Sequence, residues 1–349
     1  MQCDLLIIGA GPAGSSAAIT ACQHNLSVVV VEKRRSIGEP IQCAEYVPKL
    51  LRHEMDFSNQ CIVQEINTIK LFTKEGQVSE FSSPGYMLNR ATFDKELAAE
   101  AIKKGAKYLT NACCVSHVSG EVKIVQGSNI LNIRPKVILG ADGPKSIVGK
   151  WMNKSITDFV MGYGVELPLM KPKDYLEIYF LQSLKGGYGW LFPKGKIANV
   201  GIGMSFGENN VSEDKKILHE FCNYLETIGK VINSPLSFRA GLIPCSGLFQ
   251  ESVVGNMMLV GDAAGQTHPI TGGGIAPAVI CSKIAGNIAA KAIMGNQLEV
   301  LKNYDTQFRK VYEKEQNRAV QNRKKMIENW ENLDSMVPSI WPTFKEYYE

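Results

Sequence analysis

The segment from Cys3 to Lys33 constrains the fold of this chain more than any other. A short apolar run, Leu5–Ile8, leads directly into a glycine-rich turn, a stretch of small residues and a second apolar run, Val28–Val31. This order predicts a β-α-β unit whose strands are buried on both faces of a parallel sheet. In such units the glycines allow a tight turn, close approach of a pyrophosphate and close packing of helix on strand. The sequence therefore predicts a dinucleotide site that includes Gly9, Gly11, Pro12, Ala13 and Gly14.

The end of the second strand carries an acidic residue. Glu32 follows Gly14 by 18 residues, where its carboxylate can accept hydrogen bonds from ribose hydroxyls. The N-terminus of the intervening helix provides backbone amides and partial positive charge for the phosphates. We add Glu32 and its neighbour Lys33 to the predicted cofactor site.

Two later segments repeat the pattern of a buried strand followed by glycine and aspartate. The first ends in Gly140-Ala141-Asp142-Gly143, where Asp142 can bind hydroxyls or simply cap the next helix. The second ends in Gly261-Asp262-Ala263-Ala264-Gly265 and is followed by a glycine triplet, whose backbone amides can meet the edge of a flat ring. A helix is predicted after the triplet, over 275–294. The cofactor residues predicted here are Asp142, Gly143, Gly261, Asp262, Gly272, Gly273, Gly274 and Ile275.

The loop after Glu32 contains Cys43, and we expect a helix from about Ala44. A single cysteine is usually a packing residue, but this one follows the nucleotide unit closely. Arg90 precedes a helix predicted over 95–104, so it is either a surface charge or a group that reaches back to a pyrophosphate or to the cofactor-binding loop.

From about Trp151 the composition changes to short alternating apolar runs, which predict an antiparallel sheet. Tyr188, Trp190 and Phe192 alternate along one of these runs and so point to one face of a strand. They form either an aromatic core face or one wall of an apolar substrate channel.

Composition excludes several classes of protein. The net charge of +4 and the absence of a nucleic-acid motif argue against nucleic acid as a partner. The nine cysteines are scattered, without metal-ligand spacing, so we predict no metal. No apolar run is long enough to span a membrane, and no signal peptide precedes the first strand, which predicts a cytoplasmic protein. Residues 309–325 carry seven Lys or Arg and two Glu, which favours a solvated helix face or peripheral binding to the inner face of an anionic membrane.

The three glycine motifs, in this order, resemble those of the FAD-dependent oxidoreductases of the aromatic-hydroxylase superfamily. Within that group the chain is similar to the geranylgeranyl reductase family. Tyr188, Trp190, Phe192 and Pro193, followed after seven residues by Gly201 and Gly203, match its YxWxFP…GxG pattern. The stretch from Gly38 to Cys43 matches a loop that carries a cysteine near the flavin, although Ala44 replaces the usual glycine and Lys185 replaces a proline.

The resemblance implies an α/β fold, α+β overall: a Rossmann-like FAD-binding domain with a parallel sheet, an antiparallel-sheet substrate domain and C-terminal helices. We place the FAD-binding domain at 1–150 and 240–300, with strand insertions at 60–85, the substrate domain at 151–239 and the helical segment at 301–349.

The resemblance also implies FAD as cofactor and reduction of C=C bonds in a prenyl chain. Cys43 is the candidate catalytic residue, with a passive role as the alternative, and it is also a predicted flavin contact with Ala44 and Arg90. Tyr188, Trp190, Phe192 and His268 are the predicted substrate contacts. The implied partners are an isoprenoid or prenyl lipid and an electron donor, either NADPH, NADH or a ferredoxin, because no second nucleotide motif is present.

Three other functions remain open at this point. A flavin monooxygenase or halogenase shares the three motifs, but no halogenase-type WxWxIP segment occurs. A flavoprotein that reduces a quinone is a second possibility, and a non-catalytic carrier of prenyl lipids is a third. The intact glycines of all three motifs argue against the carrier, since a carrier does not need FAD.

Overall fold

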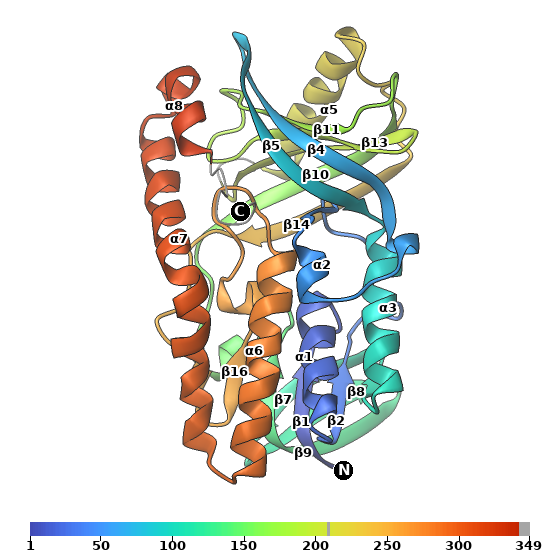
Figure 1. Ribbon diagram of the computed structural model, residues 1–349, viewed down its shortest axis with the longest axis vertical. Helices are drawn as coiled ribbons and strands as arrows, with labels where there is room; N and C mark the ends of the chain where they lie inside the picture. Colours follow the sequence, from blue (N-terminus) through green and yellow to red (C-terminus); the bar gives the residue numbers. More distant parts are fainter. Residues whose placement is uncertain (208–209, 342–349) are drawn as a thin grey trace.

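The computed structural model describes residues 1–207 and 210–341 as two stacked sheets joined by long helices. The lower sheet in Figure 1 contains the nucleotide motif, and the upper sheet is strongly curled. Helix α7 runs beside α6 and continues to the upper sheet, where α8 follows it. The helices are α1 (Pro12–Gln23), α2 (Leu51–Glu54), α3 (Arg90–Lys103), α4 (Ile147–Trp151), α5 (Val211–Thr227), α6 (Ile275–Met294), α7 (Asn303–Glu328) and α8 (Leu333–Ile340), with 3₁₀ turns at Asn59–Cys61, Gly261–Ala264, Leu298–Lys302 and Trp330–Asn332.

The lower sheet has the strand order β15-β16-β9-β1-β2-β6, and all pairs are parallel except β15 with β16. The hairpin of β7 and β8 extends β9. The strands are β1 (Gln2–Ile8), β2 (Val28–Val31), β6 (Lys107–Leu109), β7 (Ala112–Val118), β8 (Glu121–Gln126), β9 (Asn129–Gly140), β15 (Val253–Val254) and β16 (Met257–Leu259).

The apolar runs of β1 and β2 explain why this sheet is buried on both faces. Leu5 and Ile7 pack with the small residues of α1 and α6, whereas Leu6 and Ile8 pack against the β7–β8–β9 layer and α4. All four side chains are buried. The predicted β-α-β unit with a parallel sheet is therefore confirmed.

The upper sheet has the order β14-β10-β13-β12-β11-β4-β5-β3 and is antiparallel except for β11 with β4. Its strands are β3 (Tyr46–Pro48), β4 (Ile62–Thr73), β5 (Gly76–Leu88), β10 (Phe159–Pro168), β11 (Tyr175–Tyr179), β12 (Gly189–Lys194), β13 (Ile197–Ser205) and β14 (Ser237–Pro244). The strands expected as insertions at 60–85 belong to this sheet, and the expected boundary at 239/240 falls inside β14.

The helix expected from about Ala44 is wrong. Residues 46–48 form β3, whose Tyr46 pairs with Met87 of β5, and the short α2 begins only at Leu51. Glu45 has a φ of 72°, a left-handed conformation that interrupts a helix. The long-range pairing with β5 thus overrides the local preference.

The basic segment at 309–325 lies on α7 and is only partly a solvated face. Arg323 is buried and donates to the carbonyl of Gly186, while Arg309 pairs with Glu313. Tyr312 and Ala319, on the same helix, are buried. Within the described residues, no helix is both long and apolar enough to cross a bilayer.

Candidate functional site

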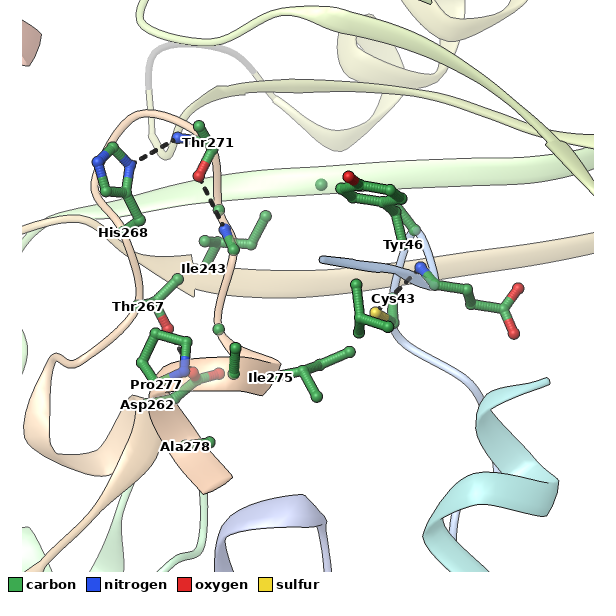
Figure 2. A pocket seen from close by; sticks show the side chains of 18 of the residues that line it. Cys43, Tyr46, Ile243, Asp262, Thr267, His268, Thr271, Ile275, Pro277 and Ala278 are labelled. Atoms are coloured by element: carbon green, nitrogen blue, oxygen red, sulfur yellow. Dashed lines mark hydrogen bonds between the residues drawn. The ribbon is translucent and has the colours of Figure 1, made fainter. Parts of the chain in front are cut away.

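A cavity of about 480 Å³ lies between the two sheets and receives residues from both. In Figure 2, Cys43 and Tyr46 lie on one side of it and the loop with Thr267, His268 and Thr271 on the other. It brings together most of the residues predicted from sequence. These are Gly11, Pro12, Ala13, Cys43, Ala44, Arg90, Gly143, Tyr188, Trp190, Phe192, Asp262, His268, Gly272, Gly273, Gly274 and Ile275.

The glycines of the first turn have two distinct roles. A Cβ on Gly14 would lie 1.9 Å from the carbonyl oxygen of Gly9, and one on Gly9 would lie 2.2 Å from that of Ala141. Both glycines are therefore required by packing inside the protein. A Cβ on Gly11, in contrast, would meet no atom of the described residues within 4 Å, so this side of the turn is open.

The residues present fit the phosphates of FAD. Helix α1 begins at Pro12, directly after the open Gly11, and no side chain in the described part of the chain caps its first amides. Uncapped amides at a helix N-terminus bind anions. Pro12 and Ala13 also line the cavity, so these residues would hold the pyrophosphate there.

Glu32 is held in place by the backbone rather than by another side chain. Its carboxylate accepts hydrogen bonds from the amides of Ala10 and Arg34, both at 2.9 Å. The carboxylate is thereby fixed beside the first turn, as a ribose-binding acid requires. Lys33 is exposed and does not line the cavity.

The two other motifs differ in how their aspartates are used. Asp142 accepts from the hydroxyl of Ser146 and the amide of Ile147, so its carboxylate orders the start of α4. Burial raises its pKa, and these hydrogen bonds oppose that shift. Asp142 therefore has the capping role, while its neighbour Gly143 lines the cavity with a φ of 81°.

Asp262, unlike Asp142, lines the cavity directly. Burial raises its pKa, while the hydroxyl of Thr267, which donates to it at 2.5 Å, and the charge of Arg90 act in the opposite direction. A carboxylate has several acceptor positions, so after accepting from Thr267 it can still accept from ligand hydroxyls. It is thus the better hydroxyl-binding aspartate of the two.

Arg90 is a half-buried group at the cavity wall and not a surface charge. Its guanidinium donates to both carboxylate oxygens of Asp94, at 3.1 and 3.0 Å. Burial alone would lower its pKa, but the negative charge of Asp94 and the interaction with Cys43 raise it. Asn89 caps α3 and so fixes the start of the helix that carries Arg90.

The Cys43 loop is fixed from the upper sheet. The carbonyl of Cys43 accepts from Asn199 Nδ2 and Arg239 Nη1, each at 3.2 Å. Its Sγ accepts from the amide of Glu45 at 3.2 Å. The backbone of the loop is therefore held at the cavity wall by residues distant in sequence, and the thiol by an amide two residues away.

The three alternating aromatics line the cavity and are also part of the core cluster of the upper sheet. Tyr188 donates its hydroxyl to the carbonyl of Thr271, and its ring centroid lies 5.5 Å from that of Trp341, which directly follows α8. Trp190 donates its Nε1–H to Asn199 Oδ1 at 2.9 Å. The core and channel-wall interpretations therefore describe the same surface.

His268 is buried and forms hydrogen bonds within its own loop. Its Nδ1 accepts from the amides of Ile270 and Thr271, which assigns the proton of the neutral ring to Nε2. Burial lowers its pKa to about 4. The ring is thus neutral at pH 7 and orders the loop that ends in the glycine triplet.

A polar network at the cavity wall was not predicted from the sequence. Glu45 is fully buried and is paired with Lys194 and Arg239, both of which also contact Glu166. The signal in the sequence is a polar residue inside an apolar strand, as Asn199 is in β13. Such residues need partners, but the sequence does not show which ones.

Comparison with known proteins gives consistent results. The profile of the geranylgeranyl reductase catalytic domain matches residues 157–241, and that of FAD dependent oxidoreductases matches residues 4–103. Digeranylgeranylglycerophospholipid reductase 1 of Methanococcoides burtonii is 32% identical in an alignment that covers 97% of this chain and 88% of that protein. The digeranylgeranylglycerophospholipid reductase of Methanothrix thermoacetophila is 35% identical and covers 88% of this chain and 83% of its own.

Solved structures show the same fold. A geranylgeranyl bacteriochlorophyll reductase-like protein from Thermoplasma acidophilum has a TM-score of 0.89 at 28% identity, covering 97% of this chain and 91% of that one. A probable FAD-dependent monooxygenase from Pseudomonas aeruginosa has a TM-score of 0.76 at 15% identity, covering 98% and 100% of the two chains, which shows the fold alone. With its nucleotide turn and aromatic cavity in place, and with relatives matched over most of its length, the chain belongs to the geranylgeranyl reductase family of FAD-dependent oxidoreductases.

Proposed function

We propose that this enzyme reduces the C=C bonds of geranylgeranyl chains carried by a glycerophospholipid. The observation that carries the proposal is a single cavity lined both by the open turn at Gly11 and by the aromatic side chains of β12. The names of the curated relatives support the choice of a phospholipid over a free prenyl diphosphate. Because such a lipid resides in a bilayer, the proposal includes peripheral association with the membrane.

An isolated alkene has no polar atom that hydrogen-bond donors can stabilise, so the protein must act mainly by positioning and by exclusion of water. Each reduced bond requires one hydride and one proton. The chemistry that bound FAD supplies is hydride donation from its reduced ring. Leu176, Ile178 and Trp190 present apolar surface to the cavity and would hold the prenyl chain.

Cys43 is the proposed proton donor. Its thiol faces the cavity, and Sγ already accepts one hydrogen bond from the Glu45 amide, which favours a fixed orientation. Transfer of its proton leaves a thiolate, and the neighbouring guanidinium of Arg90 would stabilise that charge. Solvent then returns the proton before the next bond is reduced.

The hydroxyl of Tyr188 is engaged by the Thr271 carbonyl, and the Nε1–H of Trp190 by Asn199. Both residues therefore act through their ring surfaces and through the order of the loops they contact. His268 is neutral and holds the loop of the glycine triplet through Nδ1. We propose that it contributes to the substrate wall through its position rather than as an acid.

The test is an anaerobic single-turnover experiment. FAD-loaded protein is reduced with dithionite, freed of excess reductant and mixed with digeranylgeranylglycerophospholipid in detergent. The proposal predicts that the oxidised-flavin absorbance returns and that the lipid gains mass in steps of two hydrogens. Reduced flavin that persists until air is admitted, with unchanged lipid, would reject the proposal and favour an oxygen-using enzyme.

The electron donor can be identified with the same protein. NADPH, NADH and a reduced ferredoxin are each mixed anaerobically with the oxidised enzyme, and bleaching of the flavin is followed. We expect rapid bleaching with one of these donors, because an external donor must reduce the flavin again before a second turnover.

A further inference from the structure

Asn199 connects the aromatic wall of the cavity to the cysteine loop. It lies in β13, where alternate residues such as Val200 and Ile202 belong to the apolar cluster on the other face. Its side chain is fully buried; Oδ1 accepts from Trp190 Nε1 at 2.9 Å, and Nδ2 donates to the Cys43 carbonyl at 3.2 Å. We propose that Asn199 is a positioning residue that sets Trp190 and Cys43 relative to each other.

Glu45 supports this arrangement from the loop. Its backbone amide donates to Cys43 Sγ, and its carboxylate accepts from Lys194 at 2.8 Å and Arg239 at 3.1 Å. Asn199 Nδ2 lies 3.5 Å from the same carboxylate. One amide group therefore contacts the aromatic wall, the cysteine loop and the charged network behind them.

The amide of asparagine is the group that this position requires, because Oδ1 must accept while Nδ2 must donate. An ionised aspartate can only accept, and it would lie next to the carboxylate of Glu45. Two carboxylates this close cannot both be ionised without a cost. When protonated, however, the aspartate of an Asn199→Asp protein can again donate to the Cys43 carbonyl.

In an Asn199→Asp protein, the reactivity of Cys43 and the turnover should therefore depend on the protonation of residue 199, and so on pH. At pH 8 we expect the rate of Cys43 alkylation by iodoacetamide to change about threefold or more relative to the wild type, with recovery towards pH 6. Peptide-resolved mass spectrometry separates Cys43 from the other cysteines, including the exposed Cys113. For lipid reduction, kcat at pH 8 should fall about tenfold, with a much smaller change in KM.

A double variant gives the rescue. Asn199→Asp combined with Glu45→Gln keeps the total charge but leaves one carboxylate in place of two. We expect it to lose most of the pH dependence of the single variant and to recover part of the alkylation rate and of kcat.

The matched control lies on the opposite face of the same sheet. Tyr179 is buried and donates its hydroxyl to Glu177, which is paired with Lys173 and Lys230 away from the cavity. Tyr179→Phe removes one buried hydrogen bond and should leave Cys43 alkylation and its pH profile unchanged.

The outcomes separate this inference from the proposed function on which its catalytic part rests. A wild-type alkylation profile in Asn199→Asp, or an equal shift in Tyr179→Phe, would overturn the positioning role. A shift of the alkylation profile that is confined to Asn199→Asp supports it, even if neither the wild type nor any variant reduces the lipid. That last result would reject the proposed function alone.

Discussion

The indole of Trp190 lies against the bare backbone of Gly201. A Cβ on Gly201 would lie 2.2 Å from Trp190 Cζ2, and one on Gly164, in the adjacent strand, would lie 3.4 Å from the same atom. The glycines of β10 and β13 thus provide a flat floor for the ring, beside the hydrogen bond to Asn199. This contact gives a physical reason for the spacing between tryptophan and glycine in the family pattern.

Gly201→Ala should therefore displace Trp190. Because the new Cβ would also lie 2.3 Å from the carbonyl oxygen of Tyr163, β13 should shift against β10, while the nucleotide site stays intact. Overpacking of this kind costs about 1–3 kcal/mol of folding free energy. We expect normal binding of FAD, measured by flavin absorbance, and at least a tenfold loss of lipid reduction. Gly162→Ala is the control, since its Cβ would make only ordinary contact, at 3.5 Å from Ile243. Equal losses in both variants would contradict this explanation.

Gly11 and Gly14 should respond differently to the same substitution. Gly14→Ala places a Cβ 1.9 Å from a backbone oxygen, so the protein must unfold locally or fail to accumulate. Gly11→Ala meets no protein atom, and its stability without FAD should match the wild type within about 0.5 kcal/mol. Its affinity for FAD should fall at least tenfold, because the methyl group occupies the open side of the turn. Thermal melts with and without FAD check both statements.

Cys43→Ala tests the proton donor. We expect FAD binding and thermal stability close to the wild type, because the thiol accepts from the Glu45 amide and interacts with Arg90, which keeps its pairing with Asp94. Turnover should fall at least a hundredfold, the usual range for loss of a general acid. Cys43→Ser keeps the shape and should recover only part of the activity. Unchanged turnover and product in Cys43→Ala would remove the catalytic role and leave a packing role.

His268 should make the protein less stable in acid. Its pKa is about 4 in the folded state and about 6.5 when unfolded, so between these values only the unfolded chain binds the proton. The free energy of unfolding should therefore decrease as pH falls from 6.5 to 4, by at most about 1.4 kcal/mol per pH unit. Urea titrations of His268→Gln should show a shallower decrease, whereas His53→Gln, on the surface, should follow the wild type.

The nucleotide layer was largely predictable because its signals are local. The apolar runs of β1 and β2 are each buried on both sides, and the glycines occur where the chain must turn. The helix over 275–294 was expected with the bounds that α6 has. In these segments a few adjacent residues decide the structure.

The rest of the site depends on contacts between distant parts of the chain. Nothing near Ala44 signals a strand, because β3 exists through its pairing with Tyr86 and Met87. Likewise, the side chains that bond to the Glu45 carboxylate are 149 to 194 residues away along the sequence: Lys194 in β12, Asn199 in β13 and Arg239 in β14. Alternation predicted that Tyr188, Trp190 and Phe192 share a face, but the cavity beside them required the fold.

The long ribbon of β4 and β5 leaves the lower layer, forms part of the upper sheet and returns to α3 (Figure 1). Ile69 and Phe81 of this ribbon line the cavity, whereas the residues of the nucleotide turn lie elsewhere in the chain. Changes in this one hairpin can therefore alter the length or shape of the cavity without any change to the nucleotide turn. A family built in this way can diversify among lipid tails while it preserves its redox chemistry.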